Sequence, residues 1–120
     1  MAQPLRSHDP DAALAGAQEM LQDALIVERV RNGDAESYGE LVTRHMQRAF
    51  RIAFRIVGNK QDAEDVVQDA FVRALERIDT LQKGRPFRPW LYRIVVNQAL
   101  NLRRRRRVRT TDPLPDTAPS

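Results

Sequence analysis

The chain has 120 residues, a formal net charge of +4 and no cysteine, which fits a single domain and excludes disulfides and thiolate metal sites. Its two histidines, His8 and His45, have no clustered partners in the sequence, so no zinc site is expected. No apolar stretch approaches the ~20 residues that cross a bilayer, and the N-terminus has no apolar signal core. We therefore expect a cytoplasmic protein without membrane insertion.

The N-terminal part of the chain predicts a tail followed by a helix. Residues 1–17 are rich in Ala, Asp and Pro and are expected to be disordered. Residues 18–31 have helical periodicity, with Leu21, Leu25 and Val30 on the expected apolar side.

Two longer helices follow in the middle of the chain. Asp34 is expected to cap the second helix, and Gly58 supplies a left-handed residue at its end. Asn59 is expected to cap the third helix, with Asp62 three residues later as a partial capping box. The regular apolar stripe of this third helix continues to Ile78.

A loop over 79–85 precedes the fourth helix, and Pro86 suits the first turn of that helix. The helix runs into a block of arginines, and residues 110–120 are proline-rich and read as the start of a linker. No segment reads as a strand. The sequence therefore predicts an all-α fold, a compact bundle of about four helices over 18–109 between two disordered tails.

The charges of the chain are unevenly distributed. Residues 83–109 contain one lysine, nine arginines and no acidic residue. On the third helix, by contrast, carboxylates repeat on one side, away from the apolar stripe: Asp62, Asp65, Asp69 and Glu76. These like charges repel one another and do not stabilise an isolated helix. The face is therefore either simply solvated or a docking surface for basic residues of a partner protein.

The fourth helix carries residue types that bind nucleic acids. Polar side chains follow one another along one face: Arg93, Asn97, Asn101 and Arg104. Amides can bond base edges, guanidinium groups can pair with phosphates, and Trp90 and Tyr92 can stack on an unpaired base. Two structural alternatives stay open, because Trp90 can belong to the core and Asn97 can bond a backbone carbonyl.

The run 103–107 consists of five arginines that point in all directions on a helix, so it predicts sequence-independent attraction to phosphates. A solubilising tail and an RNA-binding patch are alternative readings of the same run. The sequence has no glycine-rich phosphate loop, no nucleophile elbow and no suggested pocket around its carboxylates. We therefore expect neither an enzyme nor a cofactor.

Two motifs in this order resemble a known family. Residues 62–71, DAEDVVQDAF, resemble the polymerase-binding helix of the extracytoplasmic-function sigma factors, which belong to the sigma-70 family. Residues 87–97, FRPWLYRIVVN, resemble the promoter-melting helix of the same family, and the arginine block follows where the family has one. The resemblance covers about residues 25–107 and corresponds to the first conserved domain, region 2.

The resemblance implies the partners and their sites. Core RNA polymerase would meet the exposed face of the third helix through the clamp helices of its largest subunit, and the residues concerned are Asp62, Asp65, Gln68 and Asp69. The non-template strand of the minus-ten promoter element would meet the loop and the fourth helix. The candidate DNA-binding residues are Arg77, Lys83, Arg85, Arg88, Trp90, Tyr92, Arg93, Asn97, Asn101, Arg104 and Arg105.

The same resemblance implies a mechanism and a regulator. A pocket formed by the loop would receive one flipped base, so that capture of the single strand opens the duplex without ATP. An anti-sigma factor is expected as an inhibitory partner. The chain departs from the family at Asp69, where glutamate is usual, and at Lys83-Gly84-Arg85-Pro86, where many relatives have a more acidic or serine-containing loop.

The family also has a second helix-turn-helix domain, and nothing after Arg109 could form it. The chain is thus expected to be either cut after the first domain or a natural one-domain relative, and we favour the cut. Two other functions stay open: a sigma-like decoy bound by an anti-sigma protein, and a general arginine-rich RNA-binding protein. The decoy needs no base-reading residues, and the RNA-binding protein leaves the acidic face without a role.

Overall fold

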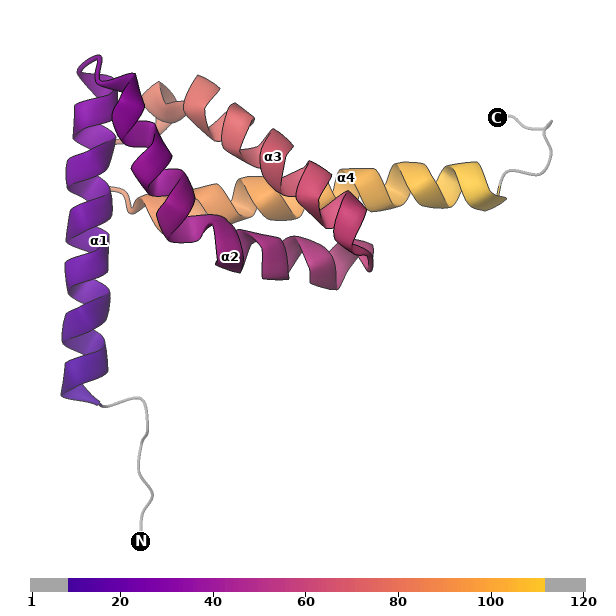
Figure 1. Ribbon diagram of the computed structural model, residues 1–120, viewed down its shortest axis with the longest axis horizontal. Coiled ribbons are helices and arrows are strands. Elements are labelled where there is room, and N and C mark those ends of the chain that lie inside the picture. The colour runs from indigo at the N-terminus through magenta and orange to yellow at the C-terminus, as the bar shows by residue number, and fades with distance from the viewer. Residues whose placement is uncertain (1–8, 112–120) are drawn as a thin grey trace, which may run out of the picture.

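The computed structural model describes residues 9–111, with side chains through Val108. Within this range the chain is helical and has no strand, which confirms the predicted all-α fold. The remaining residues, 1–8 and 112–120, include parts of both predicted tails and lie outside the described range. The elements, whose α-helices are labelled in Figure 1, are α1 (Pro10–Arg31), η2 (Ala35–Ser37), α2 (Tyr38–Val57), α3 (Lys60–Glu76), η3 (Ile78–Thr80) and α4 (Phe87–Thr111).

Helix α1 begins earlier than predicted. It starts at Pro10 instead of near Gln18, so the expectation of disorder is wrong for residues 10–17. The carboxylate of Asp9 caps the helix by accepting a hydrogen bond of 3.0 Å from the backbone N–H of Asp11, and proline suits the first helical position. The alanine-rich composition that suggested a tail is equally favourable to a helix.

The buried side of α1 also differs from the predicted one. Leu21 and Leu25 are 62% and 56% exposed, and only Val30 of the three predicted residues is buried. A second row of residues on this helix has the same spacing and is buried in the core. Its one charged residue, Asp23, can be buried because Arg44 and His45 of α2 form hydrogen bonds with its carboxylate. Its buried residues are Asp23, Ile26, Val27 and Val30.

The predicted turn residues between α2 and α3 are confirmed, whereas the predicted cap at Asp34 is corrected. Gly58 ends α2 in the left-handed region at φ 87°, and the Asn59 side chain caps α3 by accepting from the Asp62 backbone N–H at 2.9 Å. Asp34 instead precedes the short helix η2, and its carboxylate accepts a bond of 2.7 Å from the Ser37 hydroxyl, not from a backbone N–H.

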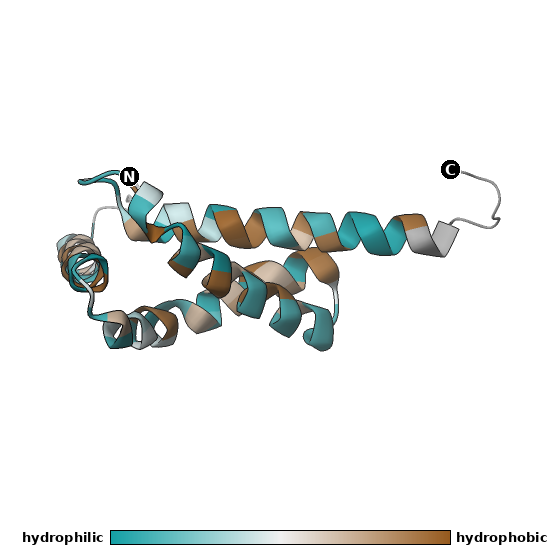
Figure 2. Cartoon of the chain, turned by 90° about the horizontal axis from the view of Figure 1, so that it is seen from above, coloured by the Kyte–Doolittle hydropathy of each residue, from teal (hydrophilic) through white to brown (hydrophobic). Residues whose placement is uncertain are grey.

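The C-terminal helix is longer than predicted. Pro86 lies directly before α4 and not in its first turn, and the helix continues to Thr111, past the expected start of the linker at residue 110. The arginine run is therefore helical. In Figure 2 this C-terminal part of α4 is a hydrophilic extension beyond the other helices.

The core lies between α2, α3 and α4, which pack against one another, while α1 stands across one end of α2 and α4 (Figure 1). Alanines of α2 and α3 are fully buried and let the helices approach closely, around the large fully buried side chains of Leu41, Leu91 and Val95. This arrangement leaves the outer faces of α3 and α4 open to partners. No described helix has the length and apolar character needed to span a membrane.

The turn between α2 and α3 gives a first prediction, which concerns Gly58. A Cβ there would meet no atom within 4 Å, so the cost of Gly58→Ala is conformational only, and we expect a loss of about 1 kcal/mol in the free energy of unfolding. Gly39→Ala is the control, since this helical glycine has φ below zero and open space, and alanine should stabilise it by up to ~1 kcal/mol. Urea denaturation measures both, and a Gly58→Ala variant as stable as the parent contradicts the account.

Candidate functional site

The outer face of α4 presents polar side chains to solvent. Arg93 and Asn97 are exposed, and neither side chain has a hydrogen-bond or ion-pair partner within residues 9–108. Asn97 therefore does not bond a backbone carbonyl, which was its alternative reading. One turn further, the side-chain Oδ1 of Asn101 accepts a hydrogen bond of 2.6 Å from Nη2 of Arg104. Donors and acceptors of this face are thus available to a ligand.

A pocket of about 310 Å³ lies beside this face, between the loop after α3 and the start of α4. Trp90 and Arg93 line it from the helix, and the Trp90 ring also packs on Phe87 at 5.8 Å between centroids. Trp90 is half-buried, so it is both part of the core and a wall of the pocket. The other lining residues are Thr80, Leu81, Gln82, Arg85, Pro86 and Pro89.

The loop itself is short and basic. Lys83 and Arg85 are exposed, and a turn with Gly84 at φ 86° and a bond from the Arg85 N–H to the Gln82 carbonyl shapes it. Arg77, at the end of α3, is exposed too, and its carbonyl accepts from the Thr80 hydroxyl at 2.6 Å. Of these three predicted basic residues, Arg85 lines the pocket.

Tyr92 and Arg88 lie on another flank of α4 and do not share the face of Arg93 and Asn97. The Tyr92 hydroxyl is 3.1 Å from Nδ1 of His45, and Arg88 forms an ion pair of 2.6 Å with Glu19 of α1. Tyr92 therefore lies on a different side of α4 from Arg93, Asn97 and Asn101, because successive residues of a helix are about 100° apart. Its predicted contact with DNA stays a prediction.

Tyr92 belongs to a buried polar network that joins three helices. Asp23 of α1 and His45 of α2 are 1% and 3% exposed, and Nε2 of His45 lies 3.0 Å from Oδ2 of Asp23. Arg44 donates from Nε to Oδ1 of Asp23 at 2.9 Å. Burial opposes ionisation of Asp23, but hydrogen bonds from His45 and Arg44 outweigh burial and hold its pKa below the ordinary value. The network fixes α1 against α2 and α4.

The acidic side of α3 is only partly as predicted. Asp65, Gln68 and Asp69 are exposed, but Asp62 is buried against α4, and its Oδ1 accepts a bond of 2.7 Å from Nη2 of Arg106. The expectation that Asp62 belongs to an exposed docking face is therefore wrong. The fold brings the end of α4 over the start of α3, so one arginine of the basic run neutralises this carboxylate.

Arg105 is placed differently from Arg104. It lines a pocket of about 230 Å³ between α3 and α4, together with Asp65 and Asp69, whereas Arg104 bonds Asn101. The two arginines thus lie on different sides of α4, as expected for successive residues of a helix.

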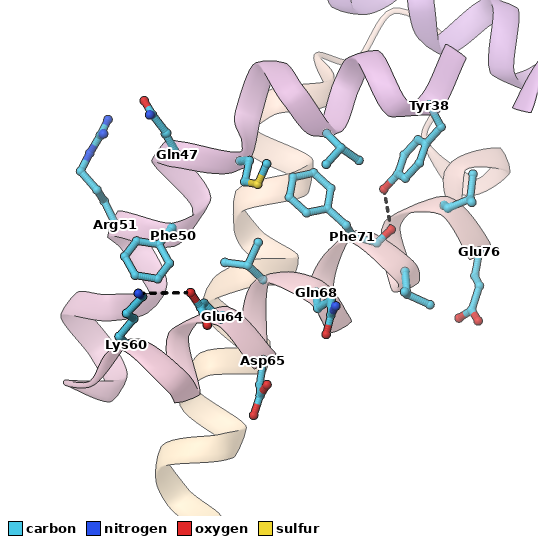
Figure 3. A pocket seen from close by; sticks show the side chains of 15 residues that line it. Tyr38, Gln47, Phe50, Arg51, Lys60, Glu64, Asp65, Gln68, Phe71 and Glu76 are labelled. Carbon is cyan, nitrogen blue, oxygen red and sulfur yellow. Dashed lines mark hydrogen bonds and ion pairs between the residues drawn. The ribbon is translucent and has the colours of Figure 1, made fainter. Parts of the chain in front are cut away.

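An apolar groove of about 1110 Å³ runs between α2 and α3 (Figure 3). Its walls include partly exposed apolar side chains, among them Met46 at 46% and Val72 at 55% exposed. Its rim includes Asp65 and Gln68, which belong to the predicted polymerase-binding set. A partner in this groove would therefore contact part of the exposed acidic side of α3.

Sequence reasoning missed the buried network and the groove. Asp23 falls in register with Ile26, Val27 and Val30, and a charged residue inside an apolar stripe was the available signal for a buried ion pair. Nothing in the sequence indicated the groove, because its apolar residues have the spacing expected of residues in the hydrophobic core. No group of three or more candidate metal ligands exists among the residues that the structure describes.

Comparisons with known proteins agree on one family. The family model of Sigma-70 region 2 matches residues 41–109. The chain is 40% identical over 83 residues to the ECF RNA polymerase sigma-E factor of Escherichia coli, covering 69% of this chain and 43% of that relative. An NMR structure of an engineered region 2 of sigmaE in complex with GTAAAA has a TM-score of 0.69 and 37% identity, covering 75% of this chain and 94% of that one.

A second solved structure, CnrH in complex with the cytosolic domain of CnrY, has a TM-score of 0.64 and 35% identity. That match covers 68% of this chain and 53% of CnrH. The chain spans less than half the length of the first curated relatives, with 43%, 31% and 43% of them covered.

Proposed function

Because the chain belongs to the extracytoplasmic-function sigma factors and carries their sigma-70 region 2, we propose that it docks on core RNA polymerase and reads and melts the minus-ten promoter element. Sigma factors are transcription initiation factors and not enzymes. In this proposal α3 meets the polymerase and α4 meets the non-template strand, while the polymerase supplies all of the chemistry.

The observation that carries the proposal is the pocket beside the exposed face of α4. It has an aromatic wall in Trp90, basic residues in Arg85 and Arg93, and a volume of about 310 Å³. Stacking on an aromatic ring and pairing of phosphates with arginine are what an unpaired base and its backbone require. Asn97 is exposed one turn from Arg93, so its amide can bond the edge of a neighbouring base.

Melting follows from capture of the single strand. Extruding a base costs a few kcal/mol of stacking and pairing, and a preformed pocket offsets that cost by stacking and hydrogen bonding. The loop and the first turns of α4 are held to the bundle by the buried Phe87 and Leu91, so the pocket exists before DNA arrives. Opening then needs no ATP.

On the polymerase side, Asp65, Gln68 and Asp69 form an exposed polar surface on α3. Carboxylates of this kind are suited to basic helices of a partner protein. Asp62 does not belong to this exposed surface. Its bond to Arg106 connects the start of α3 to α4 and thereby holds α3 in place.

An anti-sigma factor is the inhibitory partner in this proposal, and its helix occupies the apolar groove between α2 and α3. The solved complex of CnrH with the cytosolic domain of CnrY supports a protein partner for this fold. Because the groove shares Asp65 and Gln68 with the polymerase surface, one partner excludes the other.

The groove gives the next prediction. In the source bacterium, Val72→Arg should raise transcription from a reporter promoter, because a charge in the apolar groove weakens the inhibitor. Leu14→Arg on α1, 59% exposed and outside the groove, is the control and should leave the reporter unchanged. Equal reporter activity in all three strains argues against an inhibitor at this groove.

The base pocket is tested with Trp90. Trp90→Ala should weaken binding of a labelled single-stranded minus-ten oligonucleotide by about 1–3 kcal/mol, because stacking of one base is removed. Trp90→Phe keeps an aromatic wall on Phe87 and should retain most of the affinity. Fluorescence anisotropy measures both, with circular dichroism to check folding. If folded Trp90→Ala binds like the parent, the pocket does not hold a base.

A further inference from the structure

Another pocket lies where α1, α2 and α4 meet, and arginines make up half of the residues that line it. It has a volume of about 260 Å³. Arg44, Arg48 and Arg51 enter it from α2, and Arg88 enters it from α4. Among the described residues that line it, Glu19 of α1 carries the one carboxylate. Arg44 pairs with Asp23 and Arg88 pairs with Glu19, so the charges of Arg48 and Arg51 leave this pocket with a net positive charge.

The arginines differ in what already binds them. Arg44 donates three hydrogen bonds to acceptors on α1: to the Asp23 carboxylate at 2.9 Å, to the Gln22 side-chain oxygen at 2.7 Å and to the Glu19 backbone carbonyl at 3.1 Å. Its role is therefore to hold α1. Arg88 donates from Nη2 to the Glu19 carboxylate at 2.6 Å, and its buried Nε has no hydrogen-bond partner in the described part of the chain.

Arg48 and Arg51 are the available members of the set. Both side chains are exposed, and neither has a hydrogen bond or an ion pair within residues 9–108. Arg48 and Arg51 thus have donors to offer to a ligand. The Nε of Arg88 is buried away from solvent, so Arg88 can contribute through its Nη2 group, which donates to Glu19.

The charges of Arg48 and Arg88 act on the same neighbours. The hydrogen bond from Arg88 is the main cause that lowers the pKa of Glu19, and the charges of Arg88, Arg44 and Arg48 add to it against a smaller effect of burial. Burial raises the pKa of Tyr92, while Arg48 and Arg88 oppose that rise. Both arginines also line the same pocket, Arg48 from α2 and Arg88 from α4.

We propose that this pocket binds one phosphodiester group of the nucleic-acid strand that α4 reads, with Arg48, Arg51 and Arg88 as donors. The planar guanidinium fork matches the oxygens of a phosphate. Tyr92 lines this pocket and the adjacent residue Arg93 lines the base pocket, so one strand can cross the first turns of α4 and reach both. The inference rests on the proposed function.

Glu19 has a distinct part in this site. Its carboxylate occupies Nη2 of Arg88, where an oxygen of the phosphate would bind, so it acts as a competitor that the strand displaces. Glu19 comes from α1, which precedes the segment 41–109 that matches the family model. The N-terminal helix of this chain thereby lowers its affinity for nucleic acid.

The test measures binding of a single-stranded minus-ten oligonucleotide as a function of salt. The double variant Arg48→Gln, Arg51→Gln should reduce the slope of log affinity against log salt, by ~0.7 for each phosphate that no longer pairs with an arginine. The matched control, Arg55→Gln with Arg73→Gln, removes two exposed positive charges outside the pocket and should leave most of the slope. Glu19→Gln should raise affinity about fivefold.

Two further arms identify the ligand. At equal ionic strength, inorganic phosphate should compete with the oligonucleotide no better than chloride does. Displacement by phosphate from the parent but not from Arg48→Gln, Arg51→Gln would mean a site for free phosphate, which overturns the proposal. An oligonucleotide without bases should show the same change of slope in the double variant, because the interaction is with the backbone.

The outcomes separate this inference from the proposed function. An unchanged salt slope in the double variant, with base preference intact, overturns the phosphate site and leaves promoter reading standing. A reduced slope without any base preference supports the phosphate site and contradicts promoter reading. Circular dichroism of all variants excludes loss of folding as the cause.

Discussion

Asp23→Ala is expected to destabilise the fold by about 3–5 kcal/mol, because it removes one partner of a buried ion pair and leaves the other uncompensated. Asp23 and His45 are almost fully buried, and Arg44 is three-quarters buried with a side-chain exposure of 23%. For a domain of this size, that destabilisation lowers the melting temperature by more than about 12 °C. Thermal unfolding followed by circular dichroism measures it.

Glu40→Ala is the matched control for this variant. Glu40 also pairs with an arginine, Arg29, at 3.0 Å, but both side chains are at least half exposed, so its removal should cost less than ~1 kcal/mol. A melting temperature of Asp23→Ala equal to that of Glu40→Ala would show that the network joining α1, α2 and α4 contributes little.

The same carboxylate predicts a pH dependence. Since the pKa of Asp23 is lowered in the folded protein, its contribution to stability is fully present above the ordinary value of 3.8 and is lost as the pH falls through the folded-state pKa. The difference in unfolding free energy between the parent and Asp23→Ala should therefore stay constant at neutral pH and shrink only below about 3.8. A difference that already shrinks well above that value contradicts this assignment.

Reversing the charge of the exposed acids on α3 should abolish binding to core RNA polymerase. Asp65→Arg with Asp69→Arg places two positive charges against the basic helices expected in the partner, and like charges across an interface cost several kcal/mol. Both residues are exposed, so the fold should be unaffected. Surface plasmon resonance with immobilised core polymerase measures the decrease in binding.

Glu36→Arg is the control for that charge reversal, because Glu36 is exposed and belongs to η2, not to α3. It should bind polymerase like the parent. Asp62 gives a further contrast: Asp62→Asn should weaken the bond with Arg106 and lower stability, with little direct effect on the polymerase, because Asp62 is buried. If Asp65→Arg with Asp69→Arg still binds core polymerase like the parent, the proposal that α3 forms the docking surface is wrong.

Much of the fold could be predicted from the sequence because local signals were strong. The apolar stripe of α3 is regular, and its predicted residues are buried from Ala63 to Ala74, whereas Leu75, which the stripe also includes, is 39% exposed. Gly58 and Asn59 mark the turn between α2 and α3 by conformational and capping preferences that need no tertiary context. The order of these elements, with the two motifs, was sufficient to identify the family.

What the sequence could not supply depends on tertiary packing. Two stripes of α1 have the same helical spacing, and only the partners of Asp23 on α2 decide which of them is buried. Likewise, Asp62 reads as an exposed acid until the end of α4 brings Arg106 beside it. The side of α4 on which Tyr92 lies depends on where α2 packs, because its hydroxyl meets His45.

The central claim is that α4 reads the bases of a single strand. Its most direct test is binding to labelled single-stranded oligonucleotides that carry every base at each minus-ten position, at two salt concentrations, with the parent and Asn97→Ala. Arg104→Gln is the control, since removal of a charge that pairs with a phosphate should weaken all sequences uniformly and reduce the salt slope by about 0.7.

We expect the parent to prefer one base at one position by about 1–3 kcal/mol, and Asn97→Ala to lose that preference while the salt slope stays the same. Binding that ignores the sequence at both salt concentrations, and that vanishes as salt rises, would contradict the account. The arginines alone would then explain the affinity, and the chain would be a decoy or a general RNA-binding protein.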